Sequence, residues 1–234
     1  MKPRVYLDAA LEQPGEVSLN DAPAHHLARV LRLREGDALT VFNGRGGEWD
    51  AQFVGKRRVR LVAFDAVERE SPLRITLVQG VSSGDRMDYT IQKAVELGVA
   101  AIQPLITKKG VVRLEGARAS ARVEHWRKIA IAACEQCGRN RIPEVLPLIA
   151  FHQYRPQGNA LRLLLSAQGR SLREMKMEGA ATIAAGPEAG FAAEEQAALE
   201  RAGFVKASLG PRVLRTETAA LAALAALNAL QGDF

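Results

Sequence analysis

Cysteine is nearly absent from this 234-residue chain, and long apolar runs are missing altogether. With only Cys134 and Cys137 present, a disulfide framework is excluded, and a four-ligand structural zinc site would have to borrow from four scattered histidines. No apolar run approaches the roughly 20 residues that a membrane helix needs, and the first residues lack the apolar core of a signal peptide. We therefore expect a cytoplasmic protein without a membrane span.

Two phosphate-binding motifs are also missing. Neither the G-x-x-x-x-G-K-[ST] loop of nucleoside triphosphatases nor the G-x-G-x-x-G loop of dinucleotide-binding folds occurs. The adjacent His25 and His26 point in different directions on either a helix or a strand, and no Cys or carboxylate cluster completes a set of metal ligands. The sequence predicts neither a nucleoside triphosphatase nor a metal site.

The C-x-x-C spacing of Cys134 and Cys137 is typical of thioredoxin-like redox proteins when it lies where a strand passes into a helix. Here it lies within and just after a run of helical character from Trp126 to Gln136. Structural thiols are the favoured interpretation, and a redox protein is a distant alternative.

The charge that is present is unevenly distributed. Hydrophobic residues make up 47% and charged residues 25% of the chain, as in an ordinary globular protein, and the net charge is +6. Residues 1–71 carry 11 basic and 11 acidic side chains, residues 72–143 carry 12 and 6, and residues 144–234 carry 9 and 9. The whole excess lies in the middle block, which suits a polyanion such as RNA and also fits a solvated surface.

Residues 1–71 have the pattern of a small β domain. Short runs with period-two alternation are separated by turns such as Asn43 to Gly47, which is typical of hairpins. The expected strands are Val5 to Leu7, Ala38 to Phe42, Trp49 to Val54 and Val59 to Phe64. One short helix, from about Ala22 to Leu33, interrupts them.

After Ser71-Pro72 the pattern changes to strands alternating with helices, which predicts a second, α/β domain at residues 72–234 with a mainly parallel sheet. The expected strands are Arg74–Val78, Ala101–Leu105, Leu161–Leu165, Thr182–Ala185 and Val205–Leu209, and the expected helices are Asp85–Leu97, Ala119–Cys137, Ala193–Ala202 and Thr216–Leu230. The last helix carries no charge from Ala219 to Leu230, so it is buried in its own domain or against another copy of the chain. Because it is the final element, we favour a homodimer interface.

Two turns that follow expected strands are the strongest local signals of a site. The first is Ala185-Gly186-Pro187-Glu188-Ala189-Gly190, and the second runs from Leu209 to Ala219 and holds two arginines and a Thr-Glu-Thr cluster. Ligands of open α/β sheets bind beyond the carboxyl ends of the strands. The two turns are therefore predicted to form one pocket.

Two more stretches fit ordinary helices by pattern alone. Gln92, Lys93 and Glu96 lie at helical spacing and fit a solvated polar stripe. Further on, Arg139 and Arg141 follow a glycine stop and precede a proline. We expect these two arginines on an exposed helix-to-loop corner, where phosphate contacts form readily.

Together these stretches resemble the RsmE-like 16S ribosomal RNA uracil-N3 methyltransferases. The matching strings, in the same order, are Ile91-Gln92-Lys93-Ala94-Val95-Glu96-Leu97-Gly98-Val99, Glu135-Gln136-Cys137-Gly138-Arg139, Gly186-Pro187-Glu188 and Leu209-Gly210-Pro211-Arg212-Val213-Leu214-Arg215-Thr216-Glu217-Thr218-Ala219. The resemblance spans nearly the full chain. It implies a PUA-like β-barrel that binds RNA at residues 1–71, a SPOUT-type domain with a trefoil-knotted S-adenosylmethionine site at residues 72–234, and a homodimer.

The resemblance also implies which residues form the cofactor site, where glycine lets the backbone approach a bent cofactor closely. They are Leu165, Ser166, Ala185, Gly186, Pro187, Glu188, Gly190, Leu209, Gly210, Leu214, Thr216, Thr218 and Ala219. Two positions depart from the family pattern. Ala189 replaces a glycine, which costs roughly 1 kcal/mol if the turn needs a positive φ there, and Ser83 stands where many relatives carry a basic residue, so no RNA contact is assigned to it.

Methylation of uracil N3 requires an unpaired or flipped base and loss of the N3 proton. The resulting anion spreads onto two carbonyl oxygens, so a positioned cation lowers the barrier, and Arg215 is the expected cation. Glu217 either orients Arg215, which we favour, or accepts the proton. The expected RNA contacts, on 16S rRNA or the small ribosomal subunit, are Arg29, Arg32, Lys93, Lys108, Lys109, Arg139 and Arg141.

Two other functions stay open on the sequence. The first is a SPOUT methyltransferase that acts on another RNA position or on a ribose 2′-hydroxyl. The second is a non-catalytic RNA-binding or ribosome-assembly factor that keeps the fold. Binding of S-adenosylmethionine separates this second alternative from an enzyme.

Overall fold

The computed structural model describes residues 2–55, 57–158 and 160–234, and the chain divides into two compact units. Unit 1 comprises Met1–Glu70 and Cys134–Ile142, and unit 2 comprises Ser71–Ala133 and Pro143–Phe234. The expected division after Ser71 did not include the return of residues 134–142 to unit 1. That return depends on partners far away in the chain, which no local pattern reveals.

Unit 1 is built on a five-stranded sheet in the order β1-β3-β4-β5-β2. The strands are β1 (Arg4–Tyr6), β2 (Gly15–Ser18), β3 (Ala38–Phe42), β4 (Glu48–Phe53) and β5 (Arg58–Asp65). The β1–β3 pair is parallel and the other three pairs are antiparallel. Alternation along β4 buries Trp49, Ala51 and Phe53 against the core. Strand β2 escaped prediction because Val17 is its only large apolar residue.

The single helix expected from Ala22 to Leu33 is two short pieces. The α-helix α1 (Asp21–His25) passes into the π-helical turn η1 (His26–Val30). The wider turn is closed by the Leu31 amide, which donates to the His26 carbonyl at 2.9 Å. Leu27 is fully buried in the core of unit 1.

Unit 2 contains a seven-stranded sheet in the order β12-β10-β11-β6-β7-β8, with β9 also paired to β7. Every ladder among its described strands is parallel, as the alternating pattern predicted. The strands are β6 (Arg74–Gly80), β7 (Ala101–Ile106), β8 (Glu144–Val145), β9 (Ile149–Ala150), β10 (Leu161–Ser171), β11 (Ala180–Ala185) and β12 (Val205–Ser208). Only the two-residue strands β8 and β9 were not expected, because two residues carry no period.

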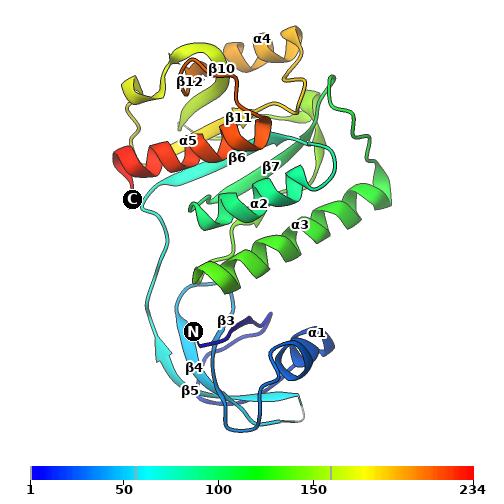
Figure 1. The fold of residues 1–234 in the computed structure, drawn as a ribbon, viewed down its shortest axis with the longest axis vertical. Coiled ribbons are helices and arrows are strands. Elements are labelled where there is room, and N and C mark those ends of the chain that lie inside the picture. The colour runs from blue at the N-terminus through cyan, green and yellow to red at the C-terminus, as the bar shows by residue number, and fades with distance from the viewer. Residues whose placement is uncertain (1, 56, 159) are drawn as a thin grey trace. The chain divides into compact units, whose positions relative to one another are not determined.

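The α-helices that follow these strands are α2 (Arg86–Glu96), α3 (Gly116–Cys137), α4 (Ala193–Arg201) and α5 (Thr216–Gln231), and two 3-10 turns are η2 (Phe151–Gln153) and η3 (Leu172–Glu174). Helix α5 packs on β6 and β11 with α2 beside it (Figure 1). Its buried side is Ala220, Ala223, Leu224, Leu227 and Asn228. No helix in the described part of the chain is long and apolar enough to cross a membrane.

Strand β10 is interrupted where it passes β12. The register shifts between Leu165 and Arg170, and Ala207 of β12 pairs with both. At Gly169 an added Cβ atom would lie 2.5 Å from the Ala207 nitrogen. Only glycine fits such a close backbone approach, so this position fixes how β10 and β12 pass each other.

Candidate functional site

The carboxyl ends of the parallel strands of unit 2 gather the predicted cofactor residues at one edge of the sheet. A pocket there brings together Leu165 and Ser166 from β10 with the segment that follows β12. Six of the predicted cofactor residues line it: Leu165, Ser166, Leu209, Gly210, Leu214 and Ala219. Ala167, Ala207, Arg212 and Val213 complete the lining and were not predicted.

A second hollow adjoins this pocket and shares Leu209, Gly210, Arg212 and Leu214 with it. Thr218, another predicted cofactor residue, lines this second hollow. Its remaining wall includes the small apolar residues Ala222, Ala226 and Ala229 of α5. The side of α5 that is not packed on the sheet is therefore apolar and partly open.

The turn from Ala185 to Gly190, here called the Gly186 turn, is linked to the start of α5. The Thr216 hydroxyl donates a hydrogen bond to the Gly186 carbonyl. An added Cβ atom at Gly186 would lie 2.7 Å from the Phe191 nitrogen, so the turn needs glycine for close packing. Predicted residues Ala185, Pro187 and Gly190 belong to this turn and do not line the two pockets described above.

The replacement of glycine by Ala189 costs no backbone strain. The Gly190 amide donates to the Pro187 carbonyl at 2.8 Å, which closes a four-residue turn. The positive φ of this turn, +68°, belongs to Gly190, and Ala189 is not among the described residues with positive φ. The position that requires glycine is therefore still glycine.

Gln79 is a site residue that sequence reasoning missed. It is fully buried at the end of β6, and its amide nitrogen donates to the Thr216 hydroxyl at 3.0 Å and lies 3.4 Å from the Gly186 carbonyl. Gln79 thereby joins β6, the Gly186 turn and the first turn of α5. A polar residue in an otherwise apolar strand was the available signal.

The Glu188 carboxylate is occupied by protein partners. Its Oε1 atom accepts hydrogen bonds from the Ser83 amide at 2.8 Å, the Ser83 hydroxyl at 2.7 Å and the Arg86 guanidinium at 2.9 Å. Partial burial works against ionisation, but the hydrogen bonds from Ser83 and Arg86 outweigh it and lower the pKa of Glu188 to about 2. Glu188 is therefore ionised at neutral pH.

Arg215 and Glu217 flank Thr216 at the start of α5. Arg215 is the N-cap residue of α5 and is exposed. Glu217 is half-buried, and its Oε2 atom is buried without a hydrogen-bond partner. Among the described residues no ion pair joins these two side chains, so the predicted orienting contact is not formed in this structure.

The predicted RNA contacts differ in how free they are. Arg29, Arg32 and Lys109 are exposed. Lys93 is half-buried and pairs with Glu96 at 2.7 Å, and Lys108 is exposed and pairs with Glu194. An exposed ion pair exchanges readily for a phosphate, because such pairs contribute little free energy.

Arg139 does not lie on the exposed corner that the sequence predicted. It is only 5% exposed, and its Nε donates to the Glu70 carboxylate at 3.0 Å within unit 1. Arg141, the other arginine expected on this corner, is exposed and pairs with Glu68 at 2.8 Å. The interpretation of Arg139 as a surface residue was wrong, because its partner lies 69 positions away in the sequence.

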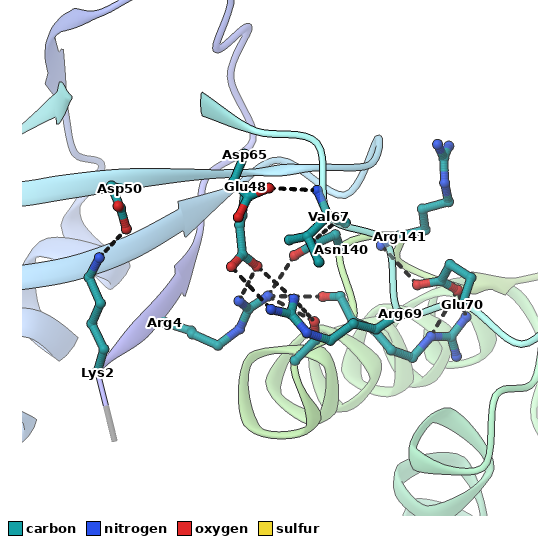
Figure 2. Close-up of polar contacts among 12 residues, drawn as sticks. Lys2, Arg4, Glu48, Asp50, Asp65, Val67, Arg69, Glu70, Asn140 and Arg141 are labelled. Carbon is teal, nitrogen blue, oxygen red and sulfur yellow. Dashed lines mark hydrogen bonds and ion pairs between the residues drawn. The ribbon is translucent and has the colours of Figure 1, made fainter. Parts of the chain in front are cut away.

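Arg139 belongs to a polar cluster in unit 1 that the sequence did not reveal. Arg4 and Arg69 converge on the Glu48 carboxylate, at 2.5 Å and 2.9 Å (Figure 2). Arg4 also donates to the Asn140 side chain at 2.7 Å. Although burial opposes it, hydrogen bonding to Arg69, Arg4 and Asn140 lowers the pKa of Glu48 to about 2.

Cys134 does not have the properties of a reactive thiol. Burial raises the pKa of the Cys134 thiol to about 12, so the reactive thiolate is disfavoured. Both cysteines are free. No group of three or more His, Cys, Asp or Glu residues able to hold a metal ion occurs among the described residues.

The parallel sheet and the pocket at its carboxyl edge define a class of protein. An RNA methyltransferase domain model matches residues 69–228, and an RNA methyltransferase PUA domain model matches residues 19–64. The chain belongs to this family of RNA methyltransferases. Within it, the chain is 34% identical over 99% of its length to ribosomal RNA small subunit methyltransferase E of Buchnera aphidicola, covering 95% of that protein. The corresponding protein of Bacillus subtilis is 30% identical, with 95% of each chain covered.

Solved structures agree with this assignment. Ribosomal RNA small subunit methyltransferase E of Neisseria gonorrhoeae, bound to S-adenosylmethionine, superposes with a TM-score of 0.91 at 42% identity and full coverage of both chains. A methyltransferase of Legionella pneumophila in complex with the same cofactor gives a TM-score of 0.95 at 38% identity, again with full coverage of both. The chain is thus a member of the ribosomal RNA small subunit methyltransferase E family.

Proposed function

We propose that this protein transfers a methyl group from S-adenosylmethionine to the N3 atom of a specific uridine in 16S ribosomal RNA. Membership in the methyltransferase E family carries the assignment to small-subunit ribosomal RNA. The pocket at the carboxyl edge of the unit 2 sheet is the observation that supports assigning the chemistry to this edge. The choice of the uracil N3 atom rests on the resemblance of four sequence strings to the RsmE-like uracil-N3 methyltransferases.

The cofactor site is proposed to join three segments. The first is Leu165 and Ser166, the second is the turn from Ala185 to Gly190, and the third runs from Leu209 to Ala219 and includes Thr216 and Thr218. The pocket lining and the Thr216 bond to Gly186 support this grouping. When bound, S-adenosylmethionine supplies the methyl group, and the residues of these segments bind and orient it.

We infer that the chain forms a trefoil knot in unit 2 and that the sheet of unit 1 closes into a barrel. The sheet order supports the knot, because β12 lies beside β10 although β11 comes between them in sequence. The close approach of Gly169 to Ala207 supports a crossing of the two segments. For the barrel, the support is the match of the PUA domain model.

Arg215 is the proposed catalytic cation. Loss of the N3 proton leaves negative charge on the two uracil carbonyl oxygens, and a guanidinium beside them stabilises that charge. Arg215 is exposed and directly follows the pocket-lining Leu214, so a flipped base entering the pocket could meet it. Glu217, which makes no ion pair with Arg215 here and has a buried carboxylate oxygen without a partner, is proposed as the group that accepts the proton or turns toward Arg215 when the substrate binds.

RNA binding is assigned to Arg29, Arg32, Lys93, Lys108, Lys109 and Arg141, and Arg139 is removed from the set because it is buried. Phosphate contacts release counterions, so RNA affinity is expected to fall steeply as salt rises. An affinity that does not change with salt would contradict this assignment. We further propose a cytoplasmic location, where ribosomal subunits are present.

A homodimer is proposed through the open apolar side of α5. Ala222, Ala226 and Ala229 line a hollow there, and Leu230 is 49% exposed. Small residues allow two helices to approach closely, and an apolar face of this kind is stabilised by burial. The molecular mass in solution by light scattering tests this proposal against a monomer.

Calorimetry tests the proposed function against the alternative of a non-catalytic RNA-binding factor. The purified protein is expected to bind S-adenosylmethionine in a saturable manner, with about one cofactor for each chain. Absence of binding would overturn the proposal and favour the RNA-binding factor. Gly186→Ala serves as the matched variant, because an added Cβ atom would lie 2.7 Å from the Phe191 nitrogen and should distort the turn.

A further inference from the structure

Hydrogen bonds to one carboxylate oxygen of Glu188 join the loop after β11 to the loop after β6. Oε1 of Glu188 accepts all three hydrogen bonds that Ser83 and Arg86 donate, at 2.7 to 2.9 Å. Ser83 lies in the loop after β6, and Arg86 begins α2. We call Glu188, Ser83 and Arg86 the turn clamp. The Glu188 side chain is 28% exposed, so water competes only partly for these bonds.

The backbones on either side of the clamp are in close contact. An added Cβ atom at Gly80 would lie 2.5 Å from Cδ and 2.7 Å from the nitrogen of Pro187. The Gly186 carbonyl is held on its other side by Thr216. The turn is thus held at two points, by the start of α5 at Gly186 and by the clamp at Glu188.

We propose that Glu188 is a positioning residue: it holds the Gly186–Gly190 turn in its cofactor-binding shape through Ser83 and Arg86, and its carboxylate does not contact the cofactor. This inference rests on the proposed function and deepens it, since it separates residues that touch the cofactor from residues that shape the site. Ser83, to which no RNA contact is assigned, acquires a structural role. The backbone of the turn, rather than the Glu188 charge, then recognises the cofactor.

Four variants separate a positioning role from a direct one. Glu188→Gln keeps an oxygen that accepts from the Ser83 amide, whereas Glu188→Ala removes the clamp entirely. Arg86→Ala removes a clamp partner while leaving Glu188 in place. Glu200→Ala is the matched control, because Glu200 pairs with Lys206 on the surface of unit 2 at 2.6 Å.

The first measurement is the dissociation constant of S-adenosylmethionine by calorimetry, with kcat and KM alongside. We expect Glu188→Ala and Arg86→Ala each to weaken binding about tenfold, and Glu188→Gln to stay within about threefold of the unchanged protein. The rise should appear in KM for the cofactor, with kcat at saturation changed by less than about threefold. Glu200→Ala should have no effect.

Two results would overturn the clamp. If Glu188→Gln binds S-adenosylmethionine as weakly as Glu188→Ala does, the carboxylate charge itself contacts the cofactor. The same conclusion follows if Arg86→Ala binds S-adenosylmethionine with normal affinity while Glu188→Ala binds it weakly. If Glu188→Ala fails to fold, as judged by its thermal unfolding, the pair Glu188→Gln and Arg86→Ala still decides.

The second measurement needs no cofactor and so distinguishes failure of the clamp from failure of the proposed function. Hydrogen exchange of the free protein is followed at the amides from Gly186 to Phe191. Arg86→Ala and Glu188→Ala should both speed exchange there by about tenfold, while Glu200→Ala leaves it unchanged. If neither clamp variant exchanged these amides faster than the unsubstituted protein, the proposal would be contradicted. This result would count against the clamp whether or not the unsubstituted protein binds the cofactor.

Discussion

The arginine cluster around Glu48 and Glu70 in unit 1 and Arg215 in unit 2 show two different uses of the same side chain. In unit 1, Arg4 and Arg69 pair with Glu48 (Figure 2). Arg139 pairs with Glu70, so all three arginines mainly stabilise the fold. In unit 2, Arg215 is exposed and follows Leu214, which lines the pocket, and it has no ion-pair partner among the described residues. An arginine count therefore says little about function until each partner is known. Substitution of a structural arginine should therefore affect stability, whereas substitution of Arg215 should affect activity.

The largest expected effect is on the stability of unit 1. Arg139→Ala would remove a buried guanidinium and leave the half-buried Glu70 carboxylate without its main partner, and should cost on the order of 3 kcal/mol of the free energy of unfolding. Urea unfolding measures this, with Arg141→Ala as the control. Arg141 is exposed, and its removal should cost less than about 1 kcal/mol. Equal costs for the two variants would break the contrast.

Arg215→Ala should do the reverse, with little change in stability and a large loss of activity. Removing a group that stabilises developing negative charge costs about 100- to 1,000-fold in kcat. Cofactor affinity should stay within about threefold, because the guanidinium is assigned to the base and not to the cofactor. Arg201→Ala, an exposed arginine at the end of α4, is the control. Near-normal turnover of Arg215→Ala would refute its catalytic role.

Acid should weaken the Glu48 cluster of unit 1. The folded-state pKa of Glu48, about 2, lies below its unfolded value near 4.5, so its ionised form stabilises the fold above the unfolded pKa. That stabilisation, on the order of 2 to 3 kcal/mol, is lost as pH falls from about 4.5 towards about 2. Urea midpoints measured across this range should fall less steeply for Glu48→Gln than for the unchanged protein.

The control for the acid experiment is Glu16→Gln. Glu16 pairs with Arg58 and Arg60 on the surface of unit 1, and hydrogen bonding to Arg60 lowers its pKa as well. Because water screens an exposed pair, its removal should leave the pH dependence almost unchanged. If Glu16→Gln flattened the curve as much as Glu48→Gln, burial would not be the reason for the effect.

The smallest expected effect belongs to the cysteines. Cys134→Ala combined with Cys137→Ser should leave methyl transfer within about twofold of the unchanged protein, because the buried Cys134 thiol is not reactive. The rate is compared with and without a reducing agent. A rate that depends on the reducing agent in the unchanged protein, and not in the variant, would revive the redox alternative.

Local sequence patterns were sufficient for most of unit 2. Its longer strands each contain a short apolar run, and its helices begin and end at residues that the pattern marks, such as Gly98 with φ of +80° just after α2. The pocket could be predicted because parallel strands deliver their carboxyl ends to one edge. Gln79 and the turn clamp escaped because each depends on partners more than 100 positions away.

Unit 1 shows the limit of such patterns more sharply. The period-two alternation located β3, β4 and β5, but it could not show that residues 134–142 return to this unit. Arg4 meets Asn140 across 136 positions of sequence, and Arg139 meets Glu70 across 69. An arginine next to a glycine stop is exposed by local criteria. Only the folded structure shows that Arg139 is buried and pairs with the Glu70 carboxylate.

Transfer of a labelled methyl group tests the central claim most directly. Purified protein is incubated with labelled S-adenosylmethionine and small ribosomal subunits that lack the modification, and the RNA is digested to nucleosides. The account predicts label in N3-methyluridine from 16S ribosomal RNA, and its loss with Arg215→Ala. Label in a ribose 2′-O-methyl nucleoside or in another base, or no label at all, would contradict it.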